Sequence, residues 1–131
     1  GLSINYKTNK MKYFFCLFLM SFIFSNCTAQ EEINSISTLE LKVLLEKGTI
    51  QLLDVRTPKE VKEGFIETAF FNNYFETDFT KKVLQTFDKS KPIYVYCRSG
   101  NRSGKSAVIL QEKGFEVYNI IGGYQQWHKE N

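Results

Sequence analysis

The chain has 131 residues, of which 43% are hydrophobic and 24% are charged, and its formal net charge is +3. The basic excess comes from the first 29 residues, which contain Lys7, Lys10 and Lys12 and no acid, so 14 basic and 14 acidic residues follow them. Residues 30–131 are therefore formally neutral, which excludes the net basic character typical of nucleic-acid-binding proteins. These residues number about 100, enough for one domain with its own core.

The first element is an apolar run at residues 13–24, preceded by Met11 and Lys12. Its twelve residues are too few to cross a bilayer of about 30 Å as a helix, which takes about 20 residues. A basic start, a short apolar middle and small polar residues after it are typical of a secretory signal peptide, which we place at residues 11–29. The alternative, a buried core helix, lacks a polar face and capping residues. Residues 1–10 precede Met11 as an upstream extension of unknown origin.

The sequence matches two alternative cleavage sites for this signal peptide. Residues 27–29 before Gln30 match a small-x-small signal peptidase site. Alternatively, residues 24–27 resemble a bacterial lipobox in which Cys27 is lipidated, although Asn26 stands where a small residue is usual. Both routes predict an exported protein of the bacterial periplasm, attached to a membrane only through its signal or through lipid at Cys27.

Behind a polar linker at residues 30–35, helical and strand-like patterns alternate. Capping-box patterns at Ser37 and Glu40, and again at Thr57 and Glu60, start the first two helices. The predicted order is helix 37–48, strand 49–56, helix 57–63, strand 68–71, helix 77–87, strand 92–96, helix 103–113, strand 115–120 and helix 122–127. This alternation predicts an α/β domain at residues 36–131, with a doubly wound, mainly parallel open sheet and helices on both faces.

Cys97 follows the apolar strand 92–96 and begins a polar loop that leads into a helix at Ser103. A free cysteine is most often a small buried hydrophobe, but here Arg98 and Arg102 flank the thiol, and the turn-forming residues 99–101 are unsuited to a core. A strand, a tight loop and a helix start direct backbone N–H groups and the helix dipole into one small cavity. Such a cavity lowers the pKa of a thiol below its free value of about 8.5. We therefore identify Cys97 as a catalytic cysteine.

Cysteine and histidine usage limits what else this site contains. Cys16 lies in the removed apolar run, so the mature chain keeps Cys97 and, after lipobox cleavage, Cys27, which is too few for a disulfide framework. No second cysteine or histidine lies near Cys97 in the sequence, so we predict no metal centre and no cofactor. The single histidine, His128, lies in a charged tail and is assigned no role.

Five motifs occur in order along residues 36–129: Asp54-Val55-Arg56, Gly64-Phe65-Ile66, Tyr96 to Ser103, Gly114-Phe115 and Gly122 to Trp127. Together they resemble the rhodanese family of single-domain sulfurtransferases, whose fold is the same α/β sheet. The resemblance implies that the Cys97 thiolate takes sulfur from a small anionic donor such as thiosulfate and becomes a persulfide. Cyanide or a thiol, which includes a protein thiol, is then expected to remove the sulfur.

The resemblance also implies roles for the loop residues. Backbone N–H groups of Arg98, Ser99, Gly100, Asn101, Arg102 and Ser103 are expected to hold the persulfide anion. Since no general base accompanies them, Ser99 and Ser103 are interpreted as a loop donor and a helix cap rather than as nucleophiles.

Charged residues around the loop are expected to support it. Arg102 is predicted to clamp the loop or the oxygens of the donor. For Arg98 two interpretations stay open, attraction of the anionic donor and a solvated surface charge. Asp54 and Arg56 are predicted to brace the end of the sheet and the site without taking part in the chemistry.

Two alternative functions differ from this enzyme. Cysteine phosphatases use a C-x5-R loop, which surrounds a phosphate, whereas Cys97 and Arg102 form the shorter C-x4-R spacing, which suits a sulfur atom. The other alternative is a persulfide carrier or protein-docking module with little turnover of small molecules. The presence of both Cys97 and Arg102 favours an enzyme.

The segment after the second helix departs from the family pattern. Phe65 stands where many members have histidine, and Glu67-Thr68-Ala69 replaces the usual Pro-Gly-Ala. Residues 70–75 are unusually aromatic and form either core and cover or a hydrophobic docking surface.

Overall fold

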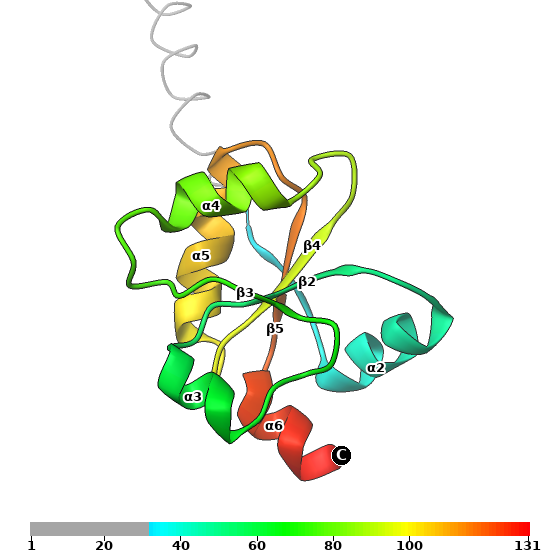
Figure 1. Ribbon diagram of the computed structural model, residues 1–131. Coiled ribbons are helices and arrows are strands. Elements are labelled where there is room, and N and C mark those ends of the chain that lie inside the picture. Colours follow the sequence, from blue (N-terminus) through cyan, green and yellow to red (C-terminus); the bar gives the residue numbers. More distant parts are fainter. Residues whose placement is uncertain (1–31) are drawn as a thin grey trace, which may run out of the picture. The chain divides into compact units, whose positions relative to one another are not determined.

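The computed structural model describes residues 32–131, which are built around a five-stranded parallel sheet (Figure 1). The strands are β1 (Asn34–Ile36), β2 (Gln51–Asp54), β3 (Phe70–Phe71), β4 (Ile93–Tyr96) and β5 (Val117–Ile120). Their order across the sheet is β1-β5-β4-β2-β3, and every neighbouring pair is parallel. Because the strands are parallel, the loops that follow them leave the sheet at one common edge.

The described part of the chain contains five helices: α2 (Thr38–Lys47), α3 (Pro58–Glu63), α4 (Phe79–Thr86), α5 (Asn101–Glu112) and α6 (Gly123–Glu130). Figure 1 shows α4 and α5 together on one side of the sheet and α2 on the other. Successive strand residues alternate between the faces, so Leu53 and Val95 join the core beneath α4 and α5, whereas Leu52 and Tyr96 join the core beneath α2. The predicted fold class is therefore confirmed.

Both predicted capping patterns start a helix. The Ser37 hydroxyl accepts a hydrogen bond from the Glu40 N–H at the start of α2. At the start of α3, Thr57 and Glu60 form a complete capping box, with Pro58 in the first turn. The box fixes the Glu60 side chain at the end of α3 that lies nearest the edge of the sheet where the loops emerge.

Strand β1 corrects the predicted linker at residues 30–35. It begins at Asn34 and pairs with β5, with Ile36 opposite Ile120. Three residues are too few to show a strand period in the sequence, and the partner strand lies more than 80 positions away along the chain. The strand is thus specified by tertiary pairing, which a local pattern does not reveal.

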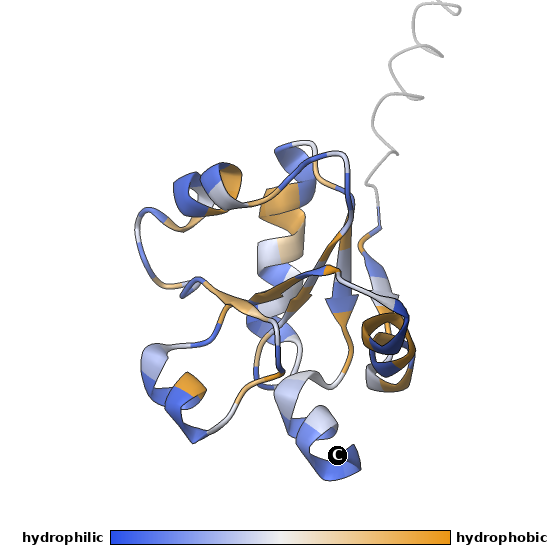
Figure 2. Cartoon of the chain, turned by 45° about the vertical axis from the view of Figure 1, so that its right-hand side comes forward, coloured by the Kyte–Doolittle hydropathy of each residue, from blue (hydrophilic) through white to orange (hydrophobic). Residues whose placement is uncertain are grey.

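The predicted upstream extension, the signal peptide and both cleavage sites lie outside the described residues. Between residues 32 and 131, none of the helices has the length and apolar character needed to cross a membrane. Residues 33–131 form one compact unit. Figure 2 shows that its C-terminal helix, α6, is mostly hydrophilic.

Candidate active site

Cys97 lies directly after β4, a strand in the interior of the sheet, and the loop that it opens ends at Gly100. Gly100 has φ 112°, in the left-handed region that favours glycine, and serves as the N-cap of α5. The helix therefore starts at Asn101, two residues earlier than predicted. As a result, Ser103 is not a helix cap but lies within the first turn of α5.

The Cys97 side chain is 1% exposed and belongs to the core beneath α5, yet its sulfur has polar partners. The Gly100 N–H donates a hydrogen bond to Sγ at 3.1 Å, and the Ser103 hydroxyl donates another at 3.3 Å. Burial by itself raises the pKa of the Cys97 thiol, but hydrogen bonds from Ser103, Gly100 and Ser99 outweigh it and lower this pKa below its usual value. The environment thus favours an anion on sulfur, which an inert core cysteine does not need.

The carbonyl groups of the loop are bound on its outer side. The Tyr124 N–H donates to the Cys97 carbonyl at 2.8 Å, and the Gln125 N–H donates to the Arg98 carbonyl at 3.0 Å. The Asn119 amide donates to the Gly100 carbonyl at 3.3 Å. With the carbonyl groups held outward by α6 and β5, N–H groups face the sulfur.

The close approach of α6 to the loop depends on a glycine. A Cβ atom on Gly123 would lie 2.5 Å from the Cys97 carbonyl oxygen and 2.7 Å from the Arg98 carbonyl oxygen, and its φ of 56° is left-handed. The sequence predicts a helix start at Gly122 and Gly123 but does not reveal that this start holds the cysteine loop. The adjacent glycines Gly122 and Gly123 are the sequence feature that indicates such a close approach of two backbone segments.

Arg102 lies in the first turn of α5 and binds α3. Its two terminal nitrogens donate to the two carboxylate oxygens of Glu60, each at 2.8 Å. The hydrogen bonds from Arg102 lower the pKa of Glu60 to about 2, and the same contact raises the pKa of Arg102. The guanidinium also lies 5.8 Å from the centre of the Phe75 ring. Arg102 is therefore bound to a neighbouring helix, and Glu60 is a site residue for which the sequence predicts only a capping role.

Asp54 and Arg56 form a second ion pair at the end of β2. Their side chains are 0% and 3% exposed, and the shortest N–O distance is 2.7 Å. Arg56 also donates to the Gly64 carbonyl at 2.7 Å, and its guanidinium lies 4.3 Å from the centre of the Tyr124 ring. The pair thus connects β2 to the segment after α3 and to α6, which in turn holds the loop.

The other predicted loop residues face solvent. Arg98, Ser99 and Asn101 are exposed, and the Arg98 side chain lines a hollow between α3 and α6. Within residues 32–131, no group of three or more potential metal ligands is present.

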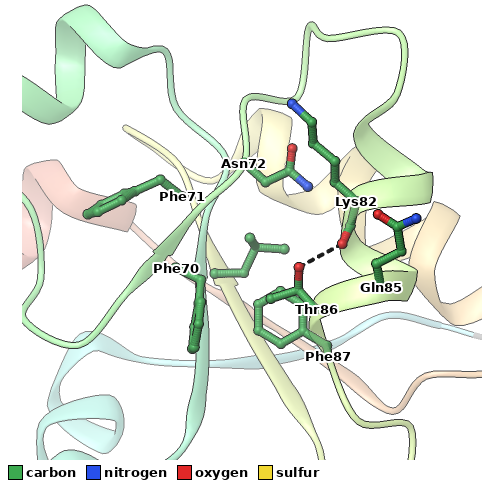
Figure 3. Close-up of a pocket in the computed structure, with 8 residues that line it drawn as sticks. Phe70, Phe71, Asn72, Lys82, Gln85, Thr86 and Phe87 are labelled. Carbon is green, nitrogen blue, oxygen red and sulfur yellow. Dashed lines mark hydrogen bonds between the residues drawn. The ribbon is translucent and has the colours of Figure 1, made fainter.

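Aromatic side chains after α3 are more exposed than a core would allow. Phe65, Phe70 and Phe71 are about half exposed and Phe75 is 65% exposed. Figure 3 shows a second hollow, between β3 and α4, which Phe70 and Phe87 line together with the buried Asn72. No residue of the cysteine loop lines this hollow, so it is separate from the candidate active site.

Comparison with known proteins agrees with this geometry. The family described as "Rhodanese-like domain" matches residues 37–130. Thiosulfate sulfurtransferase GlpE of Coxiella burnetii is 37% identical over 93 residues, which cover 70% of this chain and 84% of that protein. Thiosulfate sulfurtransferase 18 of Arabidopsis thaliana is 34% identical over 120 residues, which cover 82% of this chain and 88% of that protein. The crystal structure of a rhodanese-like domain protein from Staphylococcus aureus is 35% identical, with a TM-score of 0.66 over 72% of this chain and 91% of that one.

Proposed function

This chain belongs to the rhodanese-like domain family, and we propose that it is a thiosulfate sulfurtransferase that carries sulfur as a persulfide on Cys97. One observation supports the proposal most strongly, the direction of the hydrogen bonds around the loop. Gly100 and Ser103 donate to the sulfur, whereas the carbonyl groups of Cys97 and Arg98 accept from α6. A loop with this polarity stabilises negative charge on sulfur.

The reaction takes place in two steps. In the first, the Cys97 thiolate attacks the outer sulfur of thiosulfate, the S–S bond of the donor breaks, and sulfite leaves with the electron pair. In the second, cyanide or a thiolate attacks the terminal sulfur of the persulfide, and the electron pair of the broken bond returns to Cys97. The inward N–H groups hold the negative charge of both the thiolate and the persulfide, so neither step requires a metal or an oxidant.

The position of Arg102 supports sulfur transfer over phosphate-ester hydrolysis. In a cysteine phosphatase, the arginine that closes the loop must bind phosphate oxygens. Here both terminal nitrogens of Arg102 are bound to the Glu60 carboxylate. Together with the short C-x4-R spacing, this leaves a loop of the size and polarity that one sulfur atom needs.

A turnover assay tests the proposal. The purified protein is incubated with thiosulfate and cyanide, and thiocyanate is measured, with Cys97→Ser as the matched inactive variant. Thiocyanate formation by the wild type alone supports the enzyme. Sulfur transfer only from a persulfidated protein donor would favour the carrier alternative, and absence of transfer from any donor would contradict both.

We also propose that the protein is exported through a signal peptide at residues 11–29, on the basis of the apolar run at residues 13–24. Fractionation of bacteria that produce the full chain, followed by N-terminal sequencing of the mature protein, tests this. A new N-terminus at Gln30 indicates signal peptidase cleavage, and a lipidated Cys27 indicates the lipobox route. An uncleaved cytoplasmic protein would contradict export.

A further inference from the structure

A third hollow, of about 560 Å³, is formed by α2 and the turn after it, by residues 65–68, and by α6. No residue of the cysteine loop lines it, so it is separate from the candidate active site. Small-molecule sites in proteins have volumes of about 300–1,000 Å³. The hollow therefore has room for a small organic molecule.

Four apolar side chains line this hollow. Ile66 is 1% exposed, and Leu45 and Trp127 pack against the core cluster that contains it. Phe65 is about half exposed, and its ring lies edge-on to that of Phe71, with the ring centres 5.1 Å apart. Two aromatic and two aliphatic side chains give the apolar contact surface that most small-molecule sites have.

The turn that brings Glu67 and Thr68 into the lining is strained. The Ala69 N–H donates to the Ile66 carbonyl at 3.2 Å and closes the turn. Thr68 has φ 72°, the only positive φ of a residue other than glycine within residues 32–131. A turn that requires a positive φ at its third residue favours glycine there, and a β-branched residue in this conformation is an outlier. Such strain is common at ligand-binding sites.

The departures from the family pattern converge on the same hollow. Phe65, Glu67 and Thr68 are the three positions at which the segment after α3 departs from that pattern, and all three line the hollow. These side chains therefore distinguish this hollow in the present chain, at a place away from Cys97.

The charges in the lining favour a cation. Glu46 and Glu67 are exposed, and neither has an ion-pair partner within residues 32–131. Lys42 also lines the hollow, but it interacts electrostatically with Glu130 of α6. Two carboxylates against one ammonium group leave a negative excess, and aromatic rings attract a cation further.

We propose that this hollow binds a small amine with an apolar body, of the arylalkylammonium class. The ammonium group pairs with Glu46 and Glu67, and the apolar body packs against Phe65 and Trp127. This inference goes beyond the proposed function, because it concerns a second site that shares no residue with the cysteine loop.

The fluorescence of Trp127 reports on binding directly, because Trp127 is the only tryptophan in the chain. The purified protein is titrated with four probes in the absence of a sulfur donor. Phenethylamine carries a ring and an ammonium group, 2-phenylethanol only the ring, 3-phenylpropionate the ring and a carboxylate, and ethylamine only the ammonium group.

Phenethylamine is expected to bind with a saturable change in fluorescence. We expect 2-phenylethanol to bind about fivefold more weakly, because it forms no ion pair, and 3-phenylpropionate more weakly still, because the carboxylates repel it. Ethylamine is expected to bind more than about tenfold more weakly than phenethylamine, because it lacks the ring that the apolar side chains contact.

Variants test the charges and the ring contact separately. In Glu67→Gln and in Glu46→Gln, the affinity for phenethylamine falls about two- to fivefold, the effect typical of an exposed ion pair, and the affinity for 2-phenylethanol does not change. Phe65→Ala weakens the binding of both probes. Glu112→Gln, exposed at the far end of α5, is the matched control and keeps the wild-type affinities.

The outcomes separate this site from the sulfur chemistry. Equal binding of the amine, the alcohol and the acid would contradict a cation site. Phenethylamine that does not bind, or that binds equally to the wild type and to both glutamate variants, would contradict the assignment of this hollow. A failure of sulfur transfer would contradict only the proposed function, since the titration contains no sulfur donor.

Discussion

Two arginine–carboxylate pairs flank the cysteine loop, and they differ in burial and in what they hold. The Asp54–Arg56 pair is 0% and 3% exposed, and Arg56 has further partners in Gly64 and Tyr124. The Glu60–Arg102 pair is 26% and 19% exposed and joins two helix starts beside the loop. The comparison separates two tasks, because the buried pair maintains the framework, whereas the partly buried pair interacts electrostatically with the Cys97 thiol through Arg102.

Removing the buried arginine is expected to have the largest effect on stability. Arg56→Ala leaves the Asp54 carboxylate buried without its partner, which costs about 3–5 kcal/mol of the free energy of unfolding. Urea unfolding followed by circular dichroism measures this loss. Arg102→Ala is the matched control and is expected to cost about 1 kcal/mol or less, because water reaches the carboxylate that it leaves. Equal losses in the two variants would remove the distinction between the pairs.

Arg102→Ala is instead expected to affect sulfur loading. Without Arg102, the freed Glu60 carboxylate repels an anionic donor and α5 loses a charged hydrogen bond, so the rate of loading from thiosulfate falls about tenfold. Stopped-flow measurement of loading gives this rate. The double variant Glu60→Gln/Arg102→Ala is expected to recover part of the loss, because it also removes the carboxylate. If the double variant is slower than Arg102→Ala, the repulsion account fails.

The Glu60–Arg102 pair also predicts a pH dependence of stability. The pKa of Glu60 is about 2 in the folded protein, below its usual value of 4.5, so its contribution is fully present above about pH 5 and is lost as the pH falls toward 2. Glu60→Gln is expected to remove about 1 kcal/mol at pH 7 and to flatten the decline of stability in acid. Unfolding curves between pH 7 and pH 3 check this, and a parallel decline in both proteins would contradict it.

The smallest expected effect concerns the sulfur itself. Ser103→Ala removes a donor to Sγ, so the pKa of Cys97 rises and less thiolate is present at neutral pH. Ultraviolet thiolate absorbance as a function of pH, with Cys97→Ser as the blank, measures the midpoint. Ser106→Ala is the matched control, since the Ser106 hydroxyl donates to the Arg102 carbonyl and not to the sulfur. An unchanged midpoint in Ser103→Ala would show that the hydroxyl does not stabilise the thiolate.

Much of the fold could be predicted from local patterns. Alternating helices and strands indicated the parallel sheet, and the capping residues Ser37 and Thr57 marked two helix starts correctly. Strand β1 was not predicted, because only its pairing with β5 specifies it. The start of α5 was placed two residues late because Gly100 looked like part of a loop, whereas its left-handed conformation makes it the cap.

The site could be predicted where its residues lie within one local motif, which holds for the cysteine loop and separately for Asp54 and Arg56. Cys97 and its loop were found because strand, glycine, arginines and helix follow one another directly. Glu60 lies 42 positions from Arg102, and Tyr124 lies 27 positions beyond Cys97, so no local pattern shows that they meet. These contacts arise because the ends of parallel strands gather distant loops at one edge of the sheet.

Intact-mass measurement of the protein after a single exposure to thiosulfate tests the central claim most directly. We predict that the wild type gains the mass of one sulfur atom, that cyanide removes it completely, and that Cys97→Ser gains none. A wild-type protein whose mass does not change, or a Cys97→Ser variant that gains the same mass, would contradict a persulfide held by the Cys97 loop.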